Sequence, residues 1–371
     1  MKRIISICLL WAAISTSAFS QLTIPPDGGN KKAIVGERIG ITDVTIHYDR
    51  PAVKAREGKI WGQLVHVGYT DLGFGTSKAA PWRAGANENT TIEFSTDVKI
   101  EGQPLAAGRY GFFIAYDPNE CTLIFSKNNT SWGSFFYMET EDALRVKVKP
   151  VALDKSVERL KYEFMDQTDN SARVALLWEK LSIPFKVEVD LDKLQFESFR
   201  RELRGEKSFN PGWQSYHQAA RYAIDKNTNL EEGLAWANQA INDPFVGEAN
   251  FQTLSTKAEL LAKLGRLSEA DTLMKKAMPM GNMQQMHQYG RALMAQKKNK
   301  EALEVFKMNY QKYPNQFTTL MGMTRGYSAV GDYKNALKYA TLALPLAPNA
   351  QNKTNVEMMI QKLKDGKDVN Q

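Results

Sequence analysis

Three short segments in the N-terminal half combine aromatic rings with side chains that form strong hydrogen bonds. They are residues 48–54 (YDRPAVK), 59–62 (KIWG) and 82–90 (WRAGANENT). Indole rings offer flat apolar faces to a sugar or an aromatic group, and charged or amide side chains at a pocket rim fix the orientation of a ligand. The segments therefore predict a pocket for a small glycan or another small ligand, with six candidate residues: Arg50, Trp61, Trp82, Arg83, Asn87 and Glu88.

A structural role for these residues is the alternative, and we favour it. Residues 82–88 include too many polar groups for plain core and too many small residues for a simple strand. Arg83 would then pair with Glu88, and Asn87 would cap a turn, in a buried polar network that pins loops together. Glu88 is the acid that we single out, and we assign it no catalytic role.

Signatures of known catalytic and metal sites are missing from the sequence. The four histidines show no H-x-x-H or H-E-x-x-H spacing, and the two cysteines form no C-x-x-C pair. The G-x-S-x-G nucleophile elbow and the G-x-x-x-x-G-K-[ST] phosphate loop are also missing. We therefore expect no metal and no cofactor, and an enzyme is the less favoured interpretation.

Residues 1–20 predict a secretory signal peptide. Lys2 and Arg3 precede an apolar stretch, residues 4–14, and Ala18 and Ser20 form an A-x-S arrangement before Gln21. The apolar stretch is about half as long as a membrane-spanning helix requires, and no later segment is long and apolar enough. We expect export through the Sec pathway and a soluble periplasmic or secreted chain without a membrane span.

The length and charge of the chain limit its domain count and its partners. After removal of the signal peptide, the 371-residue chain is long enough for two or three domains. The formal charge is +7, and Lys and Arg are spread among Asp and Glu without a dense basic run. Nucleic acid is therefore not an expected partner.

Residues 32–189 predict an all-β domain. Short runs rich in β-branched and aromatic residues alternate with turn formers such as residues 101–104 (EGQP) and 117–119 (DPN). No helical period separates these runs, which are residues 41–48, 90–94, 110–116, 121–125, 144–148, 160–164, 172–178 and 185–189. Cys121 opens one of them, which favours a buried structural thiol. The pattern predicts a sandwich or jelly-roll-like domain.

The hydrophobic period changes after Val189, where the chain becomes helical. Residues 190–210 predict a connecting helix that Asp190 caps and Gly205 ends. Residues 211–366 predict helices of about 12 to 18 residues, separated by Gly, Pro and Asn. The sequence thus predicts two domains, an all-β domain followed by an all-α domain.

Small residues recur in the helical part at positions where two helices must approach closely. The spacing from Ala302 to Ala336 equals that from Pro314 to Pro348, and Ala270 precedes Ala302 by nearly as much. This pattern resembles the tetratricopeptide repeat family, in which stacked helical hairpins present a concave groove. The resemblance implies a protein or peptide partner. We expect the groove to include five residues: Tyr216, Arg221, Gln288, Arg291 and Arg325.

Two positions depart from the repeat pattern. Asn309 lies where the family prefers Ala, and Thr324 lies where it prefers Gly or Ala. These departures concern individual hairpins and leave the prediction of an array unchanged.

The N-terminal domain also resembles a known family. The three polar segments and a later one, residues 167–171 (QTDNS), are similar in order and sequence to the bacterial domain-of-unknown-function family 2911. That family has a Y-x-R-P-x-V-K start, a W-R-x-G-A-N-E-x-T core and a Q-T-D-N-S segment. Residues 66–81 form a longer connection than the family's usual turn. The resemblance covers residues 32–189 and implies no particular activity.

Taken together, these features predict an exported, non-catalytic interaction protein of the bacterial envelope. It would bind a protein partner through its helical repeats, with a candidate ligand pocket in the β domain. The alternative is an envelope enzyme or a glycan-binding receptor with its site around the W-R-A-G-A-N-E segment.

Overall fold

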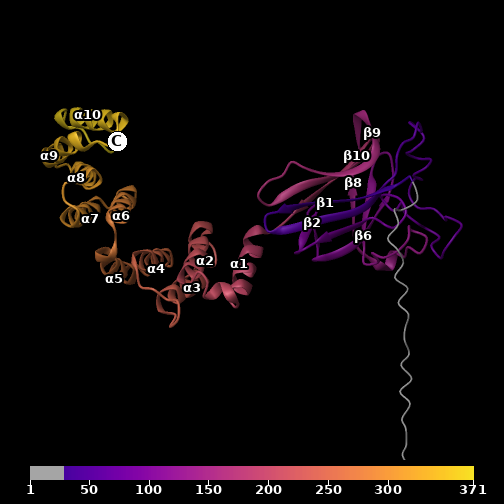
Figure 1. Ribbon diagram of the computed structural model, residues 1–371, viewed down its shortest axis with the longest axis horizontal. Coiled ribbons are helices and arrows are strands. Elements are labelled where there is room, and N and C mark those ends of the chain that lie inside the picture. The colour runs from indigo at the N-terminus through magenta and orange to yellow at the C-terminus, as the bar shows by residue number, and fades with distance from the viewer. Residues whose placement is uncertain (1–28) are drawn as a thin grey trace, which may run out of the picture. The chain divides into compact units, whose positions relative to one another are not determined.

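The computed structural model describes residues 29–371, so the predicted signal peptide lies outside the described residues. The described chain divides after Leu191 into two compact units, which we call the β unit (to Leu191) and the helical unit (Asp192–Gln371). Figure 1 shows strands in the first and helices in the second. The predicted order of an all-β domain and an all-α domain is therefore confirmed.

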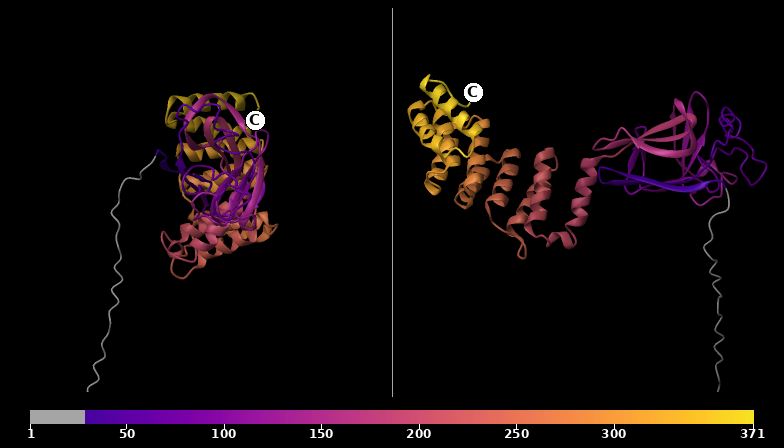
Figure 2. Two further views of the ribbon diagram at one scale, coloured as in Figure 1. Left: turned by 90° about the vertical axis from the view of Figure 1, so that its right-hand side faces the viewer. Right: turned by 45° about the horizontal axis from the view of Figure 1, so that its top comes forward.

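The β unit consists of two antiparallel sheets. The larger sheet has the order β1-β2-β3-β6-β7-β8, and the smaller has the order β5-β4-β10-β9. The strands are β1 (Lys31–Ile39), β2 (Thr42–Arg50), β3 (Thr91–Phe94), β4 (Val98–Ile100), β5 (Gln103–Leu105), β6 (Gly108–Ala115), β7 (Cys121–Ser126), β8 (Asp142–Val148), β9 (Val151–Met165) and β10 (Ser171–Glu188). Figure 2 shows β9 and β10 lying over the sheet that contains β1 and β2.

Aromatic side chains from both sheets fill the space between them. The Phe112 ring of β6 lies 5.6 Å from the Phe185 ring of β10 and 6.3 Å from the Tyr162 ring of β9, centroid to centroid. All three side chains are buried. Because alternate residues of a strand point to one face, each sheet contributes one apolar face to this core, as in a β-sandwich.

Strand β10 is continuous where the sequence suggests two strands. Its pairing with β9 shifts register on both sides of Glu179, which has a φ of +51°. A bulge of this kind lets a strand bend without ending. The buried Glu179 carboxylate accepts hydrogen bonds from the backbone N–H groups of Gly58 and Lys180, so the bulge also holds a loop of the larger sheet.

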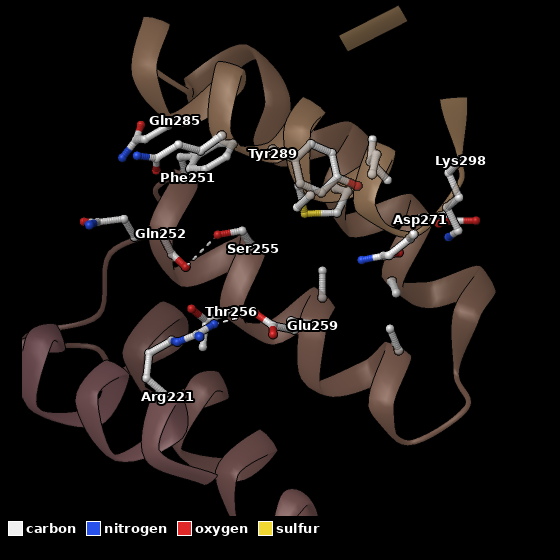
Figure 3. A pocket seen from close by; sticks show the side chains of 18 of the residues that line it. Arg221, Phe251, Gln252, Ser255, Thr256, Glu259, Asp271, Gln285, Tyr289 and Lys298 are labelled. Atoms are coloured by element: carbon white, nitrogen blue, oxygen red, sulfur yellow. Dashed lines mark hydrogen bonds and ion pairs between the residues drawn. The ribbon is translucent and has the colours of Figure 1, made fainter. Parts of the chain in front are cut away.

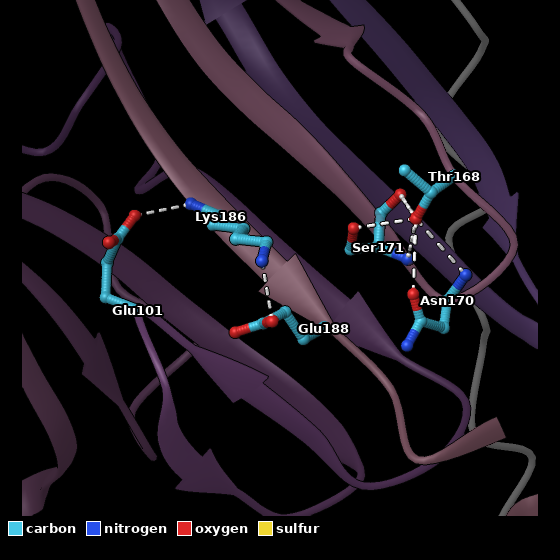
Figure 4. Close-up of polar contacts among 6 residues, drawn as sticks. All are labelled: Glu101, Thr168, Asn170, Ser171, Lys186 and Glu188. Carbon is cyan, nitrogen blue, oxygen red and sulfur yellow. Dashed lines mark hydrogen bonds and ion pairs between the residues drawn. The ribbon is translucent and has the colours of Figure 1, made fainter. Parts of the chain in front are cut away.

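The QTDNS segment forms the turn between β9 and β10. Figure 4 shows the Thr168 hydroxyl close to Ser171 and Asn170, at 2.8 Å from the Ser171 hydroxyl. Gln167 Nε2 donates to the Arg38 carbonyl near the end of β1 at 2.7 Å. In the same view Lys186 reaches Glu101, whose carboxylate accepts the Lys186 backbone N–H. The QTDNS segment and Glu101 therefore each fix one strand end to another strand.

The helical unit is a succession of helical hairpins. Its α-helices are α1 (Leu191–Glu202), α2 (Trp213–Lys226), α3 (Leu230–Asn242), α4 (Phe251–Lys263), α5 (Leu267–Ala277), α6 (Met283–Ala295), α7 (Asn299–Lys312), α8 (Phe317–Ala329), α9 (Tyr333–Ala343) and α10 (Ala350–Lys364). Helices α2 to α9 pair as α2–α3, α4–α5, α6–α7 and α8–α9, and α10 packs on α9. The first helix, α1, adds Phe196, which stacks on Trp236 of α3 at 5.9 Å.

The close approaches between hairpins depend on small residues. Phe306 of α7 is 1% exposed, and three glycines make room for its ring: Gly290 of α6 and Gly322 and Gly326 of α8. A Cβ atom at any of them would come within 2.8 Å of the ring. Phe306 therefore joins two consecutive hairpins.

The two departures from the repeat pattern have local explanations. Asn309 is fully buried, and its Nδ2 donates to the Met283 carbonyl at the start of α6 at 2.9 Å. The Thr324 hydroxyl donates to the Leu320 carbonyl, one turn earlier in α8. The Asn309 amide N–H and the Thr324 hydroxyl are thus used within the array, while the buried Asn309 Oδ1 has no partner among the described residues.

Among residues 29–371, none of the helices combines the length and the apolar character needed to cross a membrane.

Candidate functional site

The Trp82 indole, in the most distinctive part of the sequence, is folded against its own loop. The Trp82 backbone pairs with Ile114 of β6 through two hydrogen bonds of 2.8 and 2.9 Å. Its indole N–H donates to the Gly85 carbonyl at 3.1 Å, and the side chain is 8% exposed. Gly85 cannot carry a side chain, because a Cβ atom would lie 2.7 Å from the Thr90 hydroxyl. The ring is therefore part of the core.

Arg83 binds backbone and aromatic rings. Its Nη1 donates to the Asn87 carbonyl at 2.8 Å, and its guanidinium lies 5.3 Å from the Trp132 ring and 5.2 Å from the Phe135 ring. Such cation–π contacts stabilise a partly buried cation. Burial lowers the pKa of Arg83. The expected pair between Arg83 and Glu88 is not among the ion pairs of residues 29–371.

Glu88 instead belongs to a cluster with the edge strand β1. Lys32 Nζ lies 2.7 Å from a Glu88 carboxylate oxygen and 3.4 Å from Asp49 Oδ2. The hydrogen bond from Lys32 lowers the pKa of Glu88, whereas burial raises the pKa of Asp49, which is 3% exposed. Asn87, with a φ of +56°, turns the chain and accepts a hydrogen bond from Asn30.

The remaining two candidates, Arg50 and Trp61, have other partners. Arg50 Nε donates to the Leu160 carbonyl of β9 at 2.9 Å. Trp61 packs among Trp82, Tyr116 and Trp178, with ring centroids 5.6, 5.0 and 6.0 Å away. The structure thus brings Trp61 to Trp82 and Arg83 to Asn87, while the side chain of Glu88 pairs with Lys32 and that of Arg50 binds the Leu160 carbonyl.

Sequence reasoning missed the exposed rings of the β unit. Phe74, Trp132 and Phe136 are 64%, 59% and 46% exposed, and Phe74 lies 6.0 Å from Phe136 and 5.3 Å from Phe135. A run of aromatic residues outside any strand pattern, residues 132–137, was the available signal. The rings that face solvent are therefore not those of the distinctive segment.

A groove of about 550 Å³ lies in the helical unit. Its lining comes from α2, α4, α5 and α6 and from Gln296 and Lys298, which follow α6 (Figure 3). The lining residues are His217, Arg221, Phe251, Gln252, Ser255, Thr256, Ala258, Glu259, Ala262, Leu267, Ala270, Asp271, Met274, Gln285, Gln288, Tyr289, Ala292, Leu293, Gln296 and Lys298. A volume of this size is typical of ligand-binding clefts, roughly 300–1,000 Å³.

Polar contacts at one end of the groove join its first two hairpins. Arg221 of α2 forms an ion pair with Glu259 of α4, and a second with Asp225 at 3.0 Å. His217 Nε2 and the Thr256 hydroxyl lie 2.9 Å apart, and burial lowers the pKa of His217. These groups are matched to each other before any ligand arrives.

The five groove candidates fall into two sets. Arg221 and Gln288 line the groove. Tyr216 packs against the core of the unit and is partly buried. Arg291 is exposed, whereas Arg325 of α8 is half-buried and contacts Asn370 near the C-terminus. Sequence reasoning missed the apolar floor, which includes Phe251, Met274 and Tyr289, because buried and groove-lining positions share one helical period.

Comparisons with known proteins find a family model that matches the β unit and solved structures that are similar to part of the chain. Residues 30–187 match the model of a protein family of unknown function (DUF2911), which confirms the resemblance predicted for the β domain. A Podosopora anserina protein assigned as a kinesin light chain, with nearly identical TPR-like repeats, is 14% identical, over 41% of this chain and 85% of that chain (TM-score 0.31). MamA from Desulfovibrio magneticus RS-1 is 16% identical, over 43% of this chain and 95% of that chain (TM-score 0.28). No curated protein matches the chain.

Proposed function

We propose that this chain is a non-catalytic interaction protein whose helical unit binds an extended peptide segment of a partner protein. The observation that carries the proposal is the groove across α2, α4, α5 and α6, with its apolar floor and polar rim. An extended peptide places alternate side chains on opposite sides, so one set would enter the floor beside Phe251, Met274 and Tyr289.

Free amides along the groove support a peptide ligand. Gln252, Gln288 and Gln296 are exposed, and the side-chain amides of all three make no hydrogen bond within residues 29–371. A glutamine amide both donates and accepts, which matches the N–H and C=O groups of a peptide backbone. Three such amides, on α4, on α6 and directly after α6, would hold a peptide that passes between these helices.

The β unit would contribute a rigid body to this protein. The polar groups of Arg83, Asn87 and Glu88 are bound to their own loop or to β1, which favours a positioning role for the W-R-A-G-A-N-E segment. A ligand site formed by the six candidate residues of the β unit is a weaker proposal. We further propose a place in the bacterial envelope, on the strength of the signal peptide predicted for residues 1–20.

Selection from a random-peptide display library tests the proposal. The chain should enrich related peptides, and synthetic copies of them should bind with measurable affinity in fluorescence anisotropy. Ala292 is exposed and lines the groove, so Ala292→Arg should fill the groove without disturbing the core and should weaken binding at least tenfold.

The matched control is Ala350→Arg, which adds the same side chain at an exposed alanine that does not line the groove. It should bind the peptides as the parent does. The proposal would be abandoned if no peptide family were enriched, or if the two variants bound the peptides equally well.

A further inference from the structure

Three charged residues occupy equivalent positions on successive first helices of the hairpins. Arg291 of α6 and Arg325 of α8 have the same spacing along the chain as Ala302 and Ala336. Glu259 of α4 and Arg291 have the same spacing as Ala270 and Ala302. Arg221 of α2 is the ion-pair partner of Glu259 and extends this set by one hairpin. One position of the repeat therefore carries a column of charged side chains along the unit.

The two ends of this column differ in charge balance. At the first end, Arg221 is neutralised by Glu259 and Asp225. At the other end, neither Arg291 nor Arg325 forms an ion pair with any carboxylate of residues 29–371. Arg325 has one weak polar contact through its guanidinium, an Nη1 hydrogen bond of 3.4 Å to the Asn370 side chain.

His287 shows that the two arginines share one locality. It precedes Arg291 by one turn of α6, and burial, together with the charges of both arginines, lowers the pKa of its imidazole to about 4. The imidazole is therefore neutral at neutral pH, and its buried Nδ1 has no hydrogen-bond partner among the described residues. Gly322 of α8 lies beside it, where a Cβ atom would be 3.3 Å from Nδ1.

Two unpaired guanidinium groups in one place are an arrangement that a carboxylate would stabilise. Like charges repel, and each guanidinium presents a planar set of donors that fits a carboxylate with two parallel hydrogen bonds. Asp368 acts on the charge of Arg325, but from beyond ion-pair distance. The site is also continuous with the groove, because Gln288 lines the groove and lies one turn from Arg291 on the same helix.

We propose that the partner peptide is acidic and that an Asp or Glu side chain of it binds between Arg291 and Arg325. This inference rests on the proposed function and adds the chemistry of the ligand. The peptide would cross the groove beside Gln288 and place its acidic residue at the α6–α8 end. Because the ion pairs between the peptide and these arginines would be partly exposed, the affinity of the chain for the peptide should fall as the salt concentration rises.

Fluorescence anisotropy with two labelled, C-terminally amidated probes, hexaglutamate and hexaglutamine, tests the inference on the full chain. Amidation removes the terminal carboxylate, so only side chains can supply the charge. Hexaglutamate should bind the parent at least tenfold more tightly than hexaglutamine does. Arg291→Gln should reduce hexaglutamate binding at least fivefold, and Arg291→Glu should abolish it.

Arg291 is exposed, so its variants should fold, and circular dichroism checks that they do. Lys275→Gln removes an exposed cation of α5 that has no ion pair among the described residues and should leave binding unchanged. Failure of hexaglutamate to bind the parent in preference to hexaglutamine would overturn the inference. So would equal binding of hexaglutamate by the parent and Arg291→Glu.

The display selection separates this inference from the proposed function. If the chain enriches peptides that Ala292→Arg no longer binds and that lack Asp and Glu, the proposed function stands and the acidic ligand is wrong. If hexaglutamate binding depends on Arg291 while no peptide is enriched, the cationic site is real and the groove proposal fails.

Discussion

The loop of residues 82–90 and the helices α6 and α8 all carry arginines, but the two regions use them differently. In the loop, Arg83 donates to the Asn87 carbonyl and lies against Trp132 and Phe135. On the helices, Arg291 forms no ion pair with the described residues and Arg325 binds one asparagine weakly. The comparison teaches that the polar side chains of a distinctive segment can be used for contacts within the protein and not for a ligand.

Backbone hydrogen bonding explains the difference. An α-helix satisfies its own N–H and C=O groups, so side chains on its surface remain available to a partner. A loop has no such ladder, and its buried carbonyls must find side-chain donors. In this loop the carbonyls of Ala84, Gly85 and Asn87 accept from Thr90 and Tyr162, from Trp82 and from Arg83.

The largest effect that separates the two regions is expected from Trp82→Ala. Loss of a buried indole and its hydrogen bond should lower the free energy of unfolding of the β unit by about 3–5 kcal/mol. Hydrogen exchange followed by mass spectrometry on the full chain should show faster exchange in β6 and unchanged protection in α4 to α8.

The matched control for this prediction is Trp132→Ala, because Trp132 is 59% exposed. It should cost no more than about 1 kcal/mol. Equal costs for the two tryptophans would mean that the loop is not part of the core.

The pH dependence of the helical unit should show the next largest effect. Between pH 6.5 and pH 4 an unfolded chain protonates His287, whereas the folded chain does not, because burial and the two arginines lower its pKa to about 4. Stability is therefore present above pH 6.5 and is lost as the pH falls towards 4, by at most about 3 kcal/mol from this residue.

Urea unfolding of α6 to α8, followed by hydrogen exchange at pH 7 and pH 4.5, measures this dependence. His287→Gln should flatten the pH dependence of stability relative to the parent. His217→Gln, which removes another histidine of the same unit, is measured for comparison. An unchanged pH profile in His287→Gln would show that the imidazole does not titrate as inferred.

A smaller loss is expected from Arg83→Ala. The variant leaves the Asn87 carbonyl without its donor and removes the cation from two aromatic rings, which should cost the β unit about 1–3 kcal/mol. Arg83→Lys should recover little of this, because an ammonium group lacks the planar shape. Thermal unfolding measures both, and full recovery by lysine would indicate a role for charge alone.

The smallest effect on stability is expected from Arg291→Gln, within about 0.5 kcal/mol of the parent. Removal of one of two repelling cations should even raise stability slightly. Chemical denaturation measures this value beside the binding of hexaglutamate. A large loss of stability would place Arg291 with Arg83 as a structural residue and would break the comparison.

Much of the helical unit could be predicted because each hairpin depends on residues close in sequence. Ala270, Ala302 and Ala336 mark the close approach of the two helices in three hairpins, and each is buried as expected. Strand β1 was harder to predict, since it lies at the sheet edge and is largely exposed, without apolar alternation along its length. Strands β4 and β5 have only three residues each, which is too short for a periodic signal.

The partners of the candidate site residues could not be read from the sequence. Glu88 meets Lys32, which is far from it along the chain, because β1 pairs beside β2 and brings its first residues to the loop. The left-handed conformation of Asn87 returns its carbonyl to Arg83, so Arg83 and Glu88 have different partners. Short-range reasoning paired the two nearest opposite charges, whereas strand pairing determined the outcome.

The ring of Phe306, enclosed by Gly290, Gly322 and Gly326, makes the hairpins non-interchangeable. At the equivalent position the preceding hairpin has Met274 and the following one has Ala340. A hairpin moved to another place in the array would either leave the space beside the glycines empty or place an aromatic ring where no glycines make room for it. Shuffling or duplication of whole repeats is the usual way to lengthen such arrays, but at the α6–α8 junction of this chain it would disrupt the packing. Arg291 and Arg325 therefore remain neighbours as long as that junction is kept.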